Sequence, residues 1–152
     1  MTTIGGLPAH ALLVHAVVVL VPLLALLEIS CALWRPARQR LVWLVLALGI
    51  AVMVVTPLTA AAGQWLYDQD QQHQPITDIH AERGEWMKYF AIGLLVVAVI
   101  QAVQHWWESR SNEPTRVLAI AAAILAILVG VSSIVVVVWI GDAGAHAVWG
   151  GG

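Results

Sequence analysis

The sequence contains few charged residues and almost no cysteine. Only 11% of its 152 residues are Asp, Glu, Lys or Arg, whereas 61% are hydrophobic, and the mean hydropathy is +0.85. A chain with so little polar surface cannot cover a soluble globule of this size. The single cysteine, Cys31, excludes an internal disulfide. The composition therefore predicts an integral membrane protein.

The motifs of nucleotide-using and hydrolytic enzymes are also missing. The sequence has no phosphate-binding loop, no nucleophile–base pair and no cysteine metal motif. The net charge is −2, and the seven basic residues are scattered rather than clustered. These absences argue against hydrolysis, against the use of ATP and against a nucleic-acid partner.

Long apolar runs fill most of the chain. A helix needs about 20 apolar residues to cross about 30 Å of hydrocarbon, and four segments reach this length. They lie at residues 10–34, 41–67, 76–107 and 117–140. Small residues at helical spacing, such as Thr59 and Gly63, let helices pack closely in lipid. We predict an all-α, antiparallel four-helix bundle in one domain, residues 1–152, with the glycine-rich residues 141–152 partly loose.

The basic residues predict how the bundle is oriented. Five of the seven fall in the connections at residues 35–40 and 108–116, and the other two lie near the middle connection. Lysine and arginine are retained on the cytoplasmic side of a membrane. We therefore expect both termini on the outer side of a bacterial inner membrane, with the lipid bilayer around a multi-pass chain.

Four histidines fall where the predicted spans meet the outer side. An ionisable ring at a bilayer boundary needs a partner, so four rings at one level predict a shared ligand. Asp142, four residues before His146, can reach the same point if that segment is helical. We expect a single cluster, formed by His10, His15, His80 and His146. We assign His73 to the middle loop and His105 to the opposite boundary, where histidines usually contact headgroups or backbone.

Glu28 is the ionisable residue deepest in a predicted span. It lies eighteen residues after His10, five helical turns further along the same stripe. One interpretation is that its side chain snorkels towards Arg35 or Arg38. The other is that it belongs to a proton path.

The segment from Gly6 to His15, GLPAHALLVH, resembles the opening of a family of small bacterial four-helix membrane proteins, domain of unknown function twenty-two thirty-one. The small residues 59–63, His80 and His146 look like three further family features, whereas Ala11 stands where the family has proline. The resemblance implies the four-helix fold and the position of the site. Because some members are joined to redox domains, it is also suggestive of electron transfer.

Three functions fit the histidines. The first is b-type haem for electron transfer with a redox partner protein, in which His15 and His80 are the axial ligands and Arg83 meets the propionates. His10 and His146 would then bind propionates or form a second site, and residues 59–63 would leave clearance for the ring if they do not simply pack helices. The second is a Zn or Cu site. Its ligands would come from His10, His15, His80, His146 and Asp142. The third is a non-catalytic subunit of a membrane complex or homo-oligomer, in which the histidines only tie helices together.

Overall fold

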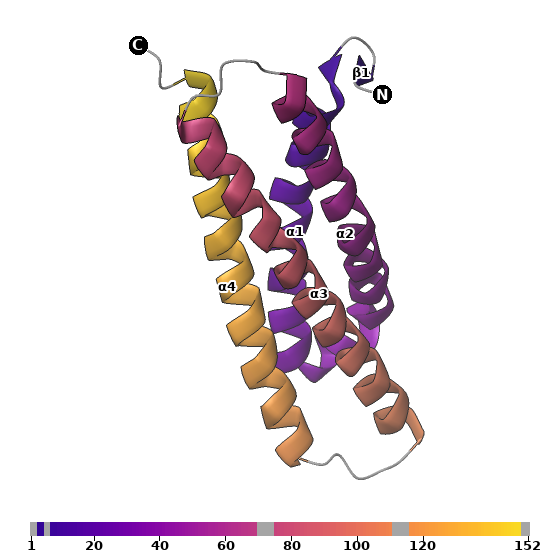
Figure 1. The fold of residues 1–152 in the computed structure, drawn as a ribbon. Coiled ribbons are helices and arrows are strands. Elements are labelled where there is room, and N and C mark those ends of the chain that lie inside the picture. The colour runs from indigo at the N-terminus through magenta and orange to yellow at the C-terminus, as the bar shows by residue number, and fades with distance from the viewer. Residues whose placement is uncertain (1–2, 5–6, 70–74, 111–115, 150–152) are drawn as a thin grey trace.

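The computed structural model describes residues 3–4, 7–69, 75–110 and 116–149, and they form a long bundle of four helices (Figure 1). Two short antiparallel strands, β1 (Thr3–Ile4) and β2 (Leu7–Pro8), precede the bundle. The helices are α1 (Ala9–Leu33), α2 (Arg35–Gln69), α3 (Pro75–Arg110) and α4 (Arg116–Trp149).

The helices alternate in direction, so that the start of α1 and the end of α4 lie at one end of the bundle (Figure 1). We call this the terminal end, and we call the end that holds the α1–α2 corner the opposite end. Each helix packs against its two neighbours in a closed ring, and α1 lies diagonally across from α3. Early residues of α1 and α3 therefore share a level with late residues of α2 and α4.

All four helices are long and apolar enough to cross a membrane. At 1.5 Å per residue, even α1, with 25 residues, reaches about 37 Å, which exceeds the hydrocarbon thickness of about 30 Å. Inside the bundle, Val21, Leu24, Val45 and Leu94 are buried, while many leucine, valine and isoleucine side chains cover the outside. An apolar outer face is what a bundle in contact with lipid requires. The predicted all-helical membrane fold is confirmed.

The structure differs from the predicted spans mainly at two places. The second helix begins at Arg35, with only Trp34 between it and the end of α1, instead of at residue 41. The last helix continues through the glycine-rich segment to Trp149 instead of ending near residue 140. Each glycine in a helix costs about 1 kcal/mol relative to alanine. Tertiary packing offsets this cost, because Ala143 is buried and Gly144 lies against the His80 ring.

Candidate functional site

A small cavity lies between all four helices in the terminal half of the bundle. Its volume is about 80 Å³, and its walls are mostly valine, isoleucine and small residues. Five of the lining residues carry a polar or sulfur atom in the side chain: His10, Thr56, Thr59, His80 and Met87. The buried Thr56 hydroxyl has no hydrogen-bond partner among the described residues. The cavity is thus apolar, with a few heteroatoms that can bind a ligand.

His10 occupies the second position of α1 and reaches across to α2. Its Nδ1 lies 3.0 Å from the backbone carbonyl oxygen of Thr59. A carbonyl oxygen can only accept, so Nδ1 carries the proton and Nε2 is left with a free lone pair. The ring rests against Gly63, where an added Cβ would stand 2.8 Å from its Cε1 atom. Glycine leaves this carbonyl open to the imidazole because it has no side chain.

His80 repeats the arrangement between α3 and α4. It follows Pro75, which suits the first turn of a helix because proline lacks the N–H that would be unsatisfied there. Its Nδ1 donates to the carbonyl oxygen of Ile140 at 3.1 Å, and the ring rests against Gly144, where a Cβ would stand 2.9 Å from Cε1. In both hairpins the accepting carbonyl lies four residues before the glycine. The two halves of the bundle thus hold their imidazoles in the same way.

The two anchored rings face a common space. Their centroids are 6.2 Å apart and their planes are inclined at 76°. Both rings line the cavity, and both have Nδ1 occupied by a backbone carbonyl. The arrangement fixes the tautomer of each ring and offers two nitrogen ligands from diagonal helices.

The structure does not bring His15 or His146 to this cavity. Both rings are exposed, and each bonds through Nδ1 to a carbonyl of its own helix, that of Ala11 and that of Asp142. His146 also lies 3.5 Å from the exposed Asp142 carboxylate. Because His15 follows His10 by five residues, it points about 140° away from it around the helix.

Arg83, the predicted propionate partner, does not line the cavity, and His105 lies far from it, where the sequence predicted it. The Arg83 guanidinium stacks 3.9 Å above the Trp139 ring and donates to the Trp139 carbonyl at 3.4 Å. His105 stacks edge-on against Trp43 near the opposite end, at 6.2 Å. His73 lies outside the described residues.

Two contributors to the site, Thr56 and Gly144, were not predicted from the sequence. Met87 follows His80 by seven residues, two helical turns on the same face, so its place beside His80 is predictable from the sequence, whereas its thioether was assigned no role. The pair Thr59 and Gly63 suggested close helix packing, whereas an imidazole lies there instead. The equivalent step Ile140 to Gly144 could be recognised only once α4 was known to continue past residue 140.

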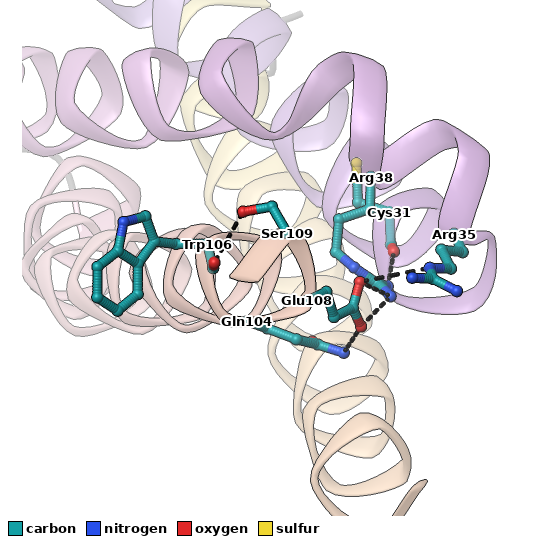
Figure 2. A network of polar contacts seen from close by, with 7 residues as sticks. All are labelled: Cys31, Arg35, Arg38, Gln104, Trp106, Glu108 and Ser109. Atoms are coloured by element: carbon teal, nitrogen blue, oxygen red, sulfur yellow. Dashed lines mark hydrogen bonds and ion pairs between the residues drawn. The ribbon is translucent and has the colours of Figure 1, made fainter. Parts of the chain in front are cut away.

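A second group of buried polar side chains lies in the other half of the bundle. Glu28 and Gln101 are both fully buried, and the Gln101 amide donates to the Glu28 backbone carbonyl at 2.7 Å. Closer to the opposite end, Arg38 donates to the Cys31 carbonyl at 2.7 Å and to both oxygens of Glu108 at 2.8 and 3.1 Å (Figure 2). Arg38 and Glu108 thus join α1, α2 and α3.

Within the described part of the chain, no three or more histidine, cysteine or carboxylate side chains are grouped so that they could hold a metal ion.

Comparison with known proteins identifies the chain without assigning it an activity. No curated protein and no solved structure matches the sequence. The family model described as "Predicted membrane protein (DUF2231)" matches residues 6–152, nearly the whole chain. The chain therefore belongs to the DUF2231 family of membrane proteins.

Proposed function

We propose that the protein is a membrane metal-binding protein that holds one copper ion between His10 and His80. The observation that carries this proposal is the pair of imidazoles, each anchored through Nδ1 on a backbone carbonyl and each left with a free Nε2. Metal-binding histidines typically donate their other ring nitrogen in this way, because the bond fixes the tautomer and the ring orientation. A copper ion that cycles between two oxidation states would suit electron transfer with a redox partner protein.

The distance between the rings favours ligation from opposite sides of an ion. A metal–nitrogen bond is about 2.0 Å long, and a ring nitrogen lies about 1.1 Å from the ring centroid. Trans imidazoles on one ion therefore have centroids about 6 Å apart, whereas a tetrahedral angle gives about 5 Å. The centroids of His10 and His80 are 6.2 Å apart. This separation fits near-linear or tetragonal copper better than tetrahedral zinc.

The remaining heteroatoms also favour copper over zinc. Met87 supplies a thioether to the cavity wall, and thioethers select Cu(I). Zinc generally takes four nitrogen, oxygen or thiolate ligands. Among the described residues that line the cavity, only His10 and His80 are side chains of the kinds that usually bind zinc. A monovalent ion with neutral ligands is also less costly to bury in an apolar cavity than a divalent one.

Haem b is the second candidate, because the same 6.2 Å separation suits the two axial imidazoles of a haem. The cavity itself does not fit the macrocycle. Its volume of about 80 Å³ is smaller than the roughly 150 Å³ that holds a benzene molecule in an engineered apolar cavity. A porphyrin would need the helices to separate, whereas a single ion would not.

The test is the metal content and the visible spectrum of the purified protein after growth with copper and ample haem. We expect one copper ion per chain, absent from His10→Ala and from His80→Ala. The matched controls His15→Ala and His146→Ala remove exposed rings bonded to their own helix and should leave the copper content unchanged. A Soret band would show that the site holds haem instead of copper. If the protein contains no metal and shows no Soret band, the histidines only join helices.

A further inference from the structure

Glu28 and Gln101 place oxygen atoms in the bundle interior with nothing to bond to. Both side chains have no exposed surface. Neither carboxylate oxygen of Glu28 has a hydrogen-bond partner among the described residues, and neither does the Gln101 amide oxygen. A buried acceptor without a donor typically costs about 1–3 kcal/mol. Three such oxygens on diagonal helices, joined by the bond from the Gln101 amide to the Glu28 carbonyl, therefore call for a donor.

No described side chain donates to the Glu28 carboxylate. Cys31 lies one turn further along α1 on the same buried face. On α2, Arg38 has its terminal nitrogens on the Cys31 carbonyl and on Glu108, and its Nε has no partner within the described structure (Figure 2). On α4, the sequence has no charged residue or histidine between Arg116 and Asp142, and the buried Ser133 donates to its own helix.

Two donors other than a neighbouring side chain can satisfy these oxygens: a buried water molecule and a proton on the Glu28 carboxyl group. The oxygens of Glu28 and Gln101 can act as acceptors, and the Arg38 Nε can act as a donor. None of these buried atoms has a hydrogen-bond partner among the described residues. Buried waters generally bridge such groups with two to four hydrogen bonds. A proton on the carboxyl group turns one of its oxygens into a donor for the Gln101 oxygen or for a bridging water.

The buried surroundings of Glu28 differ between its two sides along α1. Towards the terminal end, the buried face of α1 above Glu28 consists of Val17, Val21, Leu24 and Ala25, which carry no polar side-chain atom. Towards the opposite end, the polar groups of Arg38 and Glu108 continue to the half-exposed Arg35 (Figure 2). The described polar side chains therefore favour proton exchange with Glu28 from the opposite end, because the buried face of α1 towards the terminal end carries none.

We propose that Glu28, with Gln101 beside it, is a proton-binding site that is loaded and unloaded from the opposite end of the bundle. An ionisable residue inside a membrane span is costly, and such residues mark ion and proton sites. The site is separate from the copper site, because eighteen residues of helix place Glu28 about 27 Å from His10.

The test is infrared spectroscopy of the carboxyl C=O stretch in the purified protein. We expect a wild-type minus Glu28→Gln difference band from a buried protonated carboxyl group, with an amplitude that falls as the pH is raised from about 5 to about 9. The control Glu85→Gln removes an exposed carboxylate of α3 and should not change this band. Absence of the band at every pH would overturn the proposal, and so would a band of constant amplitude.

A second variant keeps the test decisive if Glu28→Gln does not fold. Gln101→Leu leaves the carboxyl group in place but removes its neighbouring acceptor, so the band should move in frequency and in the pH at which it is half lost. A band that does not move would show that Gln101 is not part of the proton-binding site. Copper content should be unchanged in Glu28→Gln and Gln101→Leu, so that failure of the copper proposal and failure of the proton proposal are distinguishable.

Discussion

At the scale of single residues, Gly63 and Gly144 determine where the two imidazoles can lie. Any other residue at either position would place its Cβ less than 3 Å from an imidazole carbon. Gly63→Ala and Gly144→Ala should push His10 and His80 away from their carbonyl partners. Overpacking of this kind costs about 1–3 kcal/mol of stability. Loss of such a supporting hydrogen bond lowers metal affinity about 10–100-fold.

Thermal unfolding and copper titration measure the two effects. Gly93→Ala is the control, since an added Cβ there stands 3.1 Å from a Val129 side-chain atom, away from the cavity and from both imidazoles. Equal copper affinities in Gly144→Ala and Gly93→Ala would contradict the role of the Gly144 contact.

Met87 is the residue that should set the preference for the metal. It is almost completely buried and supplies the only sulfur among the residues that line the described cavity. Met87→Leu keeps a similar volume but removes the thioether, so Cu(I) affinity should fall about tenfold, roughly 1.4 kcal/mol, with little change for Cu(II). Competition titrations with a Cu(I) chelator would measure this change. Met53→Leu is the control, because Met53 is partly buried against the core but is not among the cavity residues, and equal losses in both variants would exclude a thioether ligand.

Among the helices, Arg38 of α2 joins α1 and α3 at the opposite end through its bonds to the Cys31 carbonyl and to Glu108. Its side chain is 5% exposed and its partner Glu108 is 9% exposed, whereas Arg35, 3.7 Å from the same carboxylate, is 53% exposed. Breaking a buried pair from one side costs about 3–5 kcal/mol, because the other charge stays buried without a partner. A surface pair contributes at most about 1 kcal/mol. Arg38→Ala should therefore lower the thermal stability far more than Arg35→Ala.

A double variant checks the cause. Replacing both members by apolar residues, as in Arg38→Met with Glu108→Leu, removes the uncompensated charge and should recover much of the loss. If the double variant is as unstable as Arg38→Ala, the hydrogen bond from Arg38 to the Cys31 carbonyl, rather than the ion pair, holds the corner between α1 and α2.

At the scale of the whole molecule, the distribution of basic residues predicts that the terminal end faces out. Gln69 and Ser109 are exposed at the two ends of the bundle and can each be replaced by cysteine in a Cys31→Ser background. In intact bacterial cells, an impermeant maleimide should label Gln69→Cys and reach Ser109→Cys only after permeabilisation. The reverse pattern would place the histidine pair on the cytoplasmic side.

Length and composition are enough to predict that this chain is a four-helix membrane protein. Four apolar runs of sufficient length leave a chain in lipid no other way to pair its backbone groups, so the helices and their alternating directions follow from composition and length. It also determined that His10 and His80 share a level, because both stand at the start of helices that run in the same direction.

Which histidines meet, and which groups hold them, depends on how the four helices pack. Rotation about the axis of α1 turns His10 to the interior and His15 to the surface, and that rotation is set by the packing of all four helices. The continuation of α4 past Gly141 brings Gly144 against the His80 ring, so that residues 64 positions apart come into contact. Likewise, Arg38 of α2 pairs with Glu108 of α3, 70 positions away, and the Glu28 carboxylate has no partner among the described residues. Such long-range pairings involve no local periodicity, so no pattern in the sequence records them.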